Sequence, residues 1–192
     1  MQLRLPTSNA RVVLKLYSPN VIMPPKFADN TAWQQAELIM QPAFIRILDR
    51  IRKQLDTSAW KGTYENVLIW QPETTTETQA IVAGLVQQLE SAAPEQQEEI
   101  EQALMKLPTP TPGYHLCLQH EGLETIKVDL WELCYQVCFC NYSPLLAESP
   151  NYIVAIDTNL IDETGDVDWQ LLDEKAAHLV DRVFAQLPAI KP

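Results

Sequence analysis

Glycine is scarce in this sequence of 192 residues, which contains only five. No two of them lie within eight positions of each other: Gly62, Gly84, Gly113, Gly122 and Gly165. Loops that hold phosphate groups need closely spaced glycines, because their backbone amides must approach the anion. The sequence therefore lacks both the dinucleotide-binding fingerprint and the Walker loop, which excludes nucleotide-dependent chemistry of these two kinds.

Histidine is also scarce, with only His115, His120 and His178 available as catalytic bases. Nucleophilic catalysis needs a serine or cysteine activated by a neighbouring base, and the sequence has no Gly-x-Ser-x-Gly elbow. His115 lies in an expected strand and His178 beside the apolar stripe of an expected helix, which favours structural or surface roles. The sequence thus points to no catalytic residue. An enzyme whose site converges from scattered residues stays an open alternative.

Positive charge is in short supply, because 14 Lys and Arg stand against 25 Asp and Glu, for a net charge of −11. Nucleic acids and anionic lipids require a positive protein surface, so neither is an expected partner. The charge is uneven, with +5 in residues 1–61 and −16 in residues 62–192. This asymmetry indicates either that the two parts neutralise each other in the fold or that a polar partner binds.

Long apolar runs are absent as well. A membrane span needs about 20 mostly apolar residues, and the longest uncharged stretch, 133–147, is interrupted by Gln136, Asn141 and Pro144. Residues 1–16 lack the apolar core of a secretory signal. We therefore expect a soluble cytoplasmic protein without membrane insertion, whose four cysteines are reduced thiols rather than a disulfide framework.

Three of the cysteines form a C-x3-C-x-C cluster, and one lies upstream: Cys134, Cys138 and Cys140, with Cys117. A cysteine-ligated metal needs thiolates that converge on one ion, and this spacing matches no common zinc knuckle. In a helix, Cys134 and Cys138 share a face while Cys140 points away; in a strand, the three are spread along the chain. We predict thiols packed in the apolar interior with no metal. A cysteine-ligated metal or thiol-redox protein is the alternative.

Hydrophobic periodicity predicts the element order β-α-β-α-α-β-β-α-β-α. Strands are expected at 11–17, 63–70, 114–119, 123–128 and 152–157, and helices over 31–55, after 74–77, from Pro94, over 130–142 and from Asp168 onward. Pro42 should kink or split the first helix. Segment 130–142 also alternates as a strand would, but Asp129 and Glu132 form a capping box that favours a helix. The expected fold is α/β of the α+β type, a mixed sheet of about five strands packed with about five helices.

The strongest break in the chain is the proline-rich stretch at 108–113. A boundary there would leave two parts that are each small for a core of their own. Tryptophans also occur in expected elements on both sides of it: Trp33, Trp70, Trp131 and Trp169. We therefore predict a surface connection at 108–113 within a single compact domain over 1–192.

Residues 153–160 (IVAIDTNL) resemble the opening strand of PIN-type nucleases, where an aspartate at the strand end binds a divalent metal. Asp157 and Asn159 are the matching positions. The resemblance covers only these eight residues, and little of the chain follows to supply the further carboxylates that such nucleases need. Asp162, Asp166 and Asp168 read as turn and cap residues instead. A metal nuclease is therefore not the favoured interpretation.

Arg46, Arg50 and Lys53 are spaced four and three residues apart, which places them in a basic stripe on the first helix. The stripe is either a solvated face, paired with Asp49 or the acidic segments, or a docking site for an acidic protein. We take it as the candidate partner-binding site. Without a phosphate loop, a triad or a convincing metal set, the sequence favours a non-enzymatic acidic interaction protein that uses no cofactor. An assembly factor, an accessory subunit or a regulator would fit.

Overall fold

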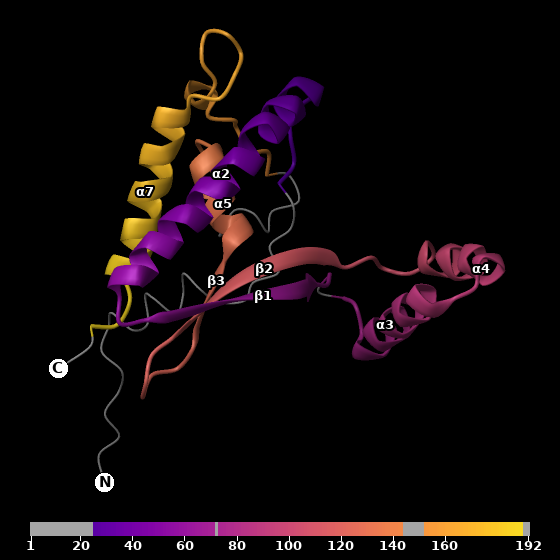
Figure 1. Ribbon diagram of the computed structural model, residues 1–192. Coiled ribbons are helices and arrows are strands. Elements are labelled where there is room, and N and C mark those ends of the chain that lie inside the picture. The colour runs from indigo at the N-terminus through magenta and orange to yellow at the C-terminus, as the bar shows by residue number, and fades with distance from the viewer. Residues whose placement is uncertain (1–24, 72, 144–151, 190–192) are drawn as a thin grey trace. The chain divides into compact units, whose positions relative to one another are not determined.

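The structure is a computed structural model that describes residues 25–71, 73–143 and 152–189 (Figure 1). Two compact units can be distinguished along the chain. The first is formed by the residues up to Glu65 and from Tyr114 onward, and the second is Asn66–Gly113. The single domain over 1–192 stays a prediction.

Helix α2 (Asn30–Thr57) confirms the first expected helix. Asp29 is its N-cap, and the carboxylate of Asp29 accepts a hydrogen bond from the Ala32 backbone N–H at 2.8 Å. The helix continues through Pro42, so the expected split does not occur. Its buried residues recur every three or four positions: Ala36, Ile39, Ala43, Ile47 and Ile51.

The core of the first unit lies among α2, α5 (Leu130–Cys138) and α7 (Trp169–Ala185), which pack against one another (Figure 1). Asp129 caps α5 and Asp168 caps α7, as the sequence predicts. The fully buried side chains come from both sides of residues 108–113, for example Ile47 and Leu172. Burying each such side chain stabilises the fold by about 1.5–3 kcal/mol.

The sheet has the order β1-β2-β3, formed by Lys61–Ile69, Thr111–Gln119 and Ile126–Asp129. Strands β2 and β3 are antiparallel, which confirms the expected hairpin. In their register, His115 lies opposite Asp129 and Cys117 opposite Lys127. The loop turns at Gly122, whose φ of 78° favours glycine.

The predicted five-stranded mixed sheet is wrong. The described residues form five α-helices, one 3-10 helix and a sheet of three strands, so the fold is α+β and rich in helix. The predicted strand 152–157 makes only isolated bridges, Lys26 with Ile153 and Phe139 with Ile156. Its β-branched residues suit a strand, but its two ends pair with different segments and no continuous ladder forms. The predicted strand 11–17 lies outside the described residues.

The second unit contains α3 (Thr76–Ser91) and α4 (Pro94–Leu104), which contact each other. Thr75 caps α3 with its hydroxyl, and Pro94 occupies the first turn of α4, where its missing N–H costs no helical hydrogen bond. Val82 is the one buried residue of α3, and α4 buries none. Both predicted helices are confirmed, but they enclose almost no core.

Two glycines should respond in opposite ways to replacement by alanine, although an added Cβ would meet nothing within 4 Å at either. Gly84 lies in the middle of α3, so Gly84→Ala should stabilise that helix by up to about 1 kcal/mol. Gly122 has a positive φ, so Gly122→Ala should destabilise the hairpin by about 1–2 kcal/mol. Urea unfolding followed by far-ultraviolet circular dichroism measures both changes. Changes of the same sign would contradict the backbone conformations described here.

Candidate functional site

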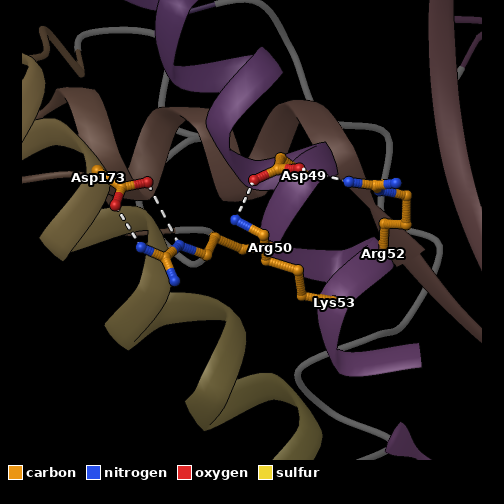
Figure 2. A network of polar contacts seen from close by, with 5 residues as sticks. All are labelled: Asp49, Arg50, Arg52, Lys53 and Asp173. Carbon is orange, nitrogen blue, oxygen red and sulfur yellow. Dashed lines mark hydrogen bonds and ion pairs between the residues drawn. The ribbon is translucent and has the colours of Figure 1, made fainter. Parts of the chain in front are cut away.

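Arg50, the middle residue of the predicted basic stripe, reaches across to helix α7. Its guanidinium forms two hydrogen bonds with the carboxylate of Asp173, and the one from Nε to Oδ1 measures 3.3 Å (Figure 2). Both side chains are 32 % exposed. The hydrogen bonds that Arg50 donates to Asp173 raise the pKa of Arg50. This charge pair therefore links α2 to α7 within the first unit.

Lys53, the last residue of the stripe, stays on its own helix. Its Nζ lies 2.6 Å from Oδ2 of Asp49, whose other oxygen accepts a hydrogen bond from Arg52 at 3.1 Å (Figure 2). Hydrogen bonds from Lys53 and then Arg52 lower the pKa of Asp49. The negative charge of Asp49 therefore partly neutralises the positive charges of Arg52 and Lys53.

Arg46, the first residue of the stripe, lies over the ring of Trp169 at the start of α7, 5.2 Å from its centroid. Within the described part of the chain, its Nε is buried without a hydrogen-bond partner. Arg46 and Arg50 thus both contact α7, while Lys53 contacts Asp49. The three residues lie on one helix, but each of them already interacts with another residue of the chain. Partner binding at this stripe stays a prediction.

The cysteines are not gathered into one site. Cys134 and Cys138 are buried on one face of α5, and the Cys134 thiol donates a hydrogen bond to the Met40 carbonyl at 3.3 Å. The neighbouring Cys138, together with burial, raises the pKa of Cys134 well above its ordinary value. Cys117 is buried, and its thiol donates to a Glu65 carboxylate oxygen at 3.3 Å. Burial, and then Glu65, raise its pKa.

Cys140 corrects the prediction that every thiol packs in the interior, because it is exposed. Helix α5 ends at Cys138, the extended Phe139 turns its ring into the core, and Cys140 points outward. Burial and then Asp157 raise the pKa of this thiol too. Thiols with raised pKa values are poor nucleophiles at neutral pH. No group of three or more potential ligands that could hold a metal ion occurs within the described ranges.

Asp157 and Asn159, the residues of the nuclease-like segment, are hydrogen-bonded to each other, and Asp157 also pairs with a lysine of the same chain. The Asp157 carboxylate accepts hydrogen bonds from Lys175 Nζ at 2.6 Å and from the Asn159 amide at 2.9 Å. Burial opposes ionisation, but these two hydrogen bonds lower the pKa of Asp157. The positive charge beside the Asp157 carboxylate is therefore that of Lys175.

Two carboxyl groups, those of Asp129 and Glu132, lie close together at the start of α5. In the sequence they are recognisable only as a capping box that begins a helix. Asp129 accepts hydrogen bonds from the backbone N–H of Trp131 at 2.8 Å and of Glu132 at 3.1 Å. His115 Nε2 lies 3.7 Å from Asp129 Oδ2, across the hairpin. Burial, and then the charge of Asp129, raise the pKa of Glu132 to about 7. Glu132 is therefore a carboxyl that titrates near neutral pH.

This pair borders a small cavity of about 130 Å³ among β3, α5 and α7. Leu133, Leu179 and Val183 line its apolar part, and Arg182 lies at its edge with the two carboxyl groups. A carboxyl with a pKa near 7 can exchange a proton at physiological pH. Both groups already have structural partners, however, because Asp129 caps α5 and Glu132 accepts a hydrogen bond from Gln136 at 3.2 Å.

A larger hollow of about 480 Å³ lies between α3 and α4 in the second unit, and we call it the hairpin groove. Leu85, Ile100 and Ala103 supply its apolar lining, and Gln88 and Glu99 are among its polar residues. Two large apolar side chains of α3 are exposed, Ile81 by 49 % and Val86 by 45 %, and so is Met105, just after α4, by 76 %. The sequence pattern identified apolar sides on both helices but could not show that they stay uncovered.

The second unit is also acidic. Asn66–Gly113 contains seven Asp and Glu residues and one Lys, for a net charge of −6. The apolar side chains of the groove therefore lie in a unit whose net charge is negative.

Comparison with known proteins adds no relative: no family model matches the chain, and no curated protein or solved structure is significantly similar to it. Within residues 25–71, 73–143 and 152–189, no helix has both the length and the hydrophobicity that crossing a bilayer requires. The surfaces of the protein itself are therefore the basis for inferring its function.

The Arg50–Asp173 pair should contribute to stability. A double-mutant cycle with Arg50→Ala, Asp173→Ala and both together should give a coupling free energy of about 0.5–1 kcal/mol, the range for partly exposed pairs. Chemical denaturation at low salt measures it. The same cycle on Arg52 and Asp181, which share no contact in the structure, is the matched control and should give a coupling near zero. Equal coupling in both cycles would contradict the link between α2 and α7.

Glu132 should make the protein less stable as the pH rises. Its folded-state pKa of about 7 lies above the ordinary value of 4.5, so the folded protein binds this proton more tightly than the unfolded chain. The resulting stability is complete below about pH 4.5 and is lost as the pH rises through 7. Glu132→Gln should remove that loss, gaining on the order of 3 kcal/mol relative to the wild type between pH 4.5 and pH 8.

Denaturant unfolding across this pH range measures the effect of Glu132→Gln. The exposed Glu124 offers a matched control, and Glu124→Gln should leave the pH dependence unchanged. If Glu132→Gln and the wild type lost stability in parallel, the buried carboxyl would not be the titrating group.

Proposed function

We propose that this protein is a non-enzymatic interaction protein, an assembly factor, accessory subunit or regulator, and that α3 and α4 form its binding surface. The observation that carries the proposal is the exposure of apolar side chains on α3 and just after α4, two helices that bury only Val82 between them. A helical hairpin with exposed apolar faces and a groove between its helices is a frequent form of protein-binding surface.

The energetics of the two helices support this proposal. Helices of 16 and 11 residues are marginal in water on their own, and their stability comes mainly from packing an apolar face. A partner that covers Ile81, Val86 and Met105 would supply burial that the chain does not provide. Each side chain so covered adds about 1.5–3 kcal/mol.

The polar groups of the first unit support a non-enzymatic role. The thiols of Cys117 and Cys134 have raised pKa values, and the Asp157 carboxylate accepts a hydrogen bond from Lys175. The Asp129 carboxylate is used to begin α5. These groups are thus engaged in holding the fold, whereas Ile81, Val86 and Met105 are exposed.

Photo-crosslinking in the native host tests the proposal. The full chain carries p-benzoylphenylalanine in place of Met105 or, as the matched control, in place of the exposed Glu163 of the first unit. We expect one discrete adduct from position 105, with its partner identified by mass spectrometry, and none from position 163. The adduct should disappear in a Val86→Asp background. Absence of an adduct at 105, or the same adduct from both positions, would contradict the proposal.

A further inference from the structure

We propose that the hairpin groove binds a basic amphipathic helix of a partner protein. This inference rests on the proposed function and names the chemistry of the partner. It is carried by the lining of the groove, by the charge around it and by its size.

The lining of the groove selects an apolar ligand face. Leu85 from α3 meets Ile100 and Ala103 from α4 across the hollow, so anchors on the ligand would lie between the two helices. Met105, 76 % exposed just beyond α4, adds a flexible side chain that can adapt to ligands of different shape. Leucine or phenylalanine side chains are the anchors that such a surface takes from a helix.

The size of the groove is compatible with one face of a helix. A volume of about 480 Å³ has room for a few large side chains. Helix α4 has 11 residues and so is roughly 16 Å long. Over that length, a bound helix presents anchors at positions i, i+3 or i+4, and i+7.

The charge around the groove selects a basic ligand. Glu99 is part of the lining, and Glu95, Glu98 and Glu101 lie on the same short helix, all of them exposed. Lysine or arginine beside the apolar anchors would meet these carboxylates and speed association. The net charge of −6 in this unit disfavours a second copy of the chain, because two such surfaces repel each other.

Fluorescence anisotropy with the full-length protein and a synthetic probe tests this inference. The probe is a fluorescein-labelled 14-residue helix of leucine and lysine, with leucine on one face and lysine on the other. The comparison probe has the same composition in scrambled order, so that no apolar face forms. We expect saturable binding of the amphipathic probe, about tenfold tighter than that of the scrambled probe.

Charge reversal on α4 locates the binding. The double variant Glu98→Lys, Glu99→Lys should weaken binding of the amphipathic probe about tenfold. The matched control, Glu121→Lys with Glu163→Lys, makes the same change of net charge at exposed positions of the first unit and should leave the affinity within about twofold. A circular dichroism spectrum unchanged from the wild type shows that α4 is retained in the variant.

Several results would overturn the inference. Equal binding of the scrambled probe, or equal weakening by the control variant, would reduce the interaction to general attraction between opposite charges. A dimer in sedimentation that Leu85→Asp, a substitution in the lining, dissociates would assign the groove to a second copy. Binding that appears only after Arg4→Ser, Arg11→Ser and Lys15→Ser would assign it to the basic segment at residues 1–24 of the same chain.

The failure of this inference can be told apart from the failure of the proposed function. If position 105 crosslinks to a partner but the amphipathic probe does not bind, the interaction surface stands and the basic helix is wrong. If neither the crosslink nor the probe gives a signal, both proposals fail.

Discussion

The packing of α2 against α7 and α5 is the constraint on which the first unit depends. Ile39, Ile47 and Ile51 are repeated on one side of a 28-residue helix, and all are essentially inaccessible to solvent. Because the two helices pack closely, charged residues beside the packed faces also contact across them. Arg50 forms an ion pair with Asp173, and Arg46 lies over the ring of Trp169. Two residues of the basic stripe therefore contact α7 and the third pairs with Asp49, so the stripe is not a free cationic surface.

The second unit shows the opposite condition. Its two helices have caps and apolar sides, yet they enclose one buried residue, Val82. Helices α3 and α4 contact each other, and no further helix is described within Asn66–Gly113 that could complete a core with them. The surface of these helices has exposed apolar side chains, and most of its charged groups are carboxylates. Such a surface is suited to a partner that has apolar side chains and positive charge.

Local features of the fold could be predicted from the sequence because local interactions decide them. Periodicity found α2 and α7, and the Asp129 capping box correctly favoured a helix over a strand for α5. Pairing at long range could not be predicted in this way. The apolar run at 152–157 has strand-forming residues, but its partners, Lys26 and Phe139, are distant segments that no local pattern identifies.

In the candidate sites too, local features could be predicted from the sequence and long-range contacts could not. Spacing placed Arg46 and Arg50 on one face of a helix, but Asp173, the partner of Arg50, lies 123 residues further along the chain. The exposure of Cys140 depends on where α5 ends, which periodicity defines only to within a few residues. The uncovered face of α3 and α4 could not be found either, because an apolar stripe looks the same whether or not another element packs on it.

The claim that α3 and α4 lack a core of their own is tested most directly by native-state hydrogen exchange. It predicts that their amides open with a free energy several kcal/mol below that of the amides of α2 and α7, which should exchange only through global unfolding. If the amides of α3 and α4 were as well protected as those of α2 and α7, the second unit would have sufficient packing within the chain. The argument for a binding surface there would then fail.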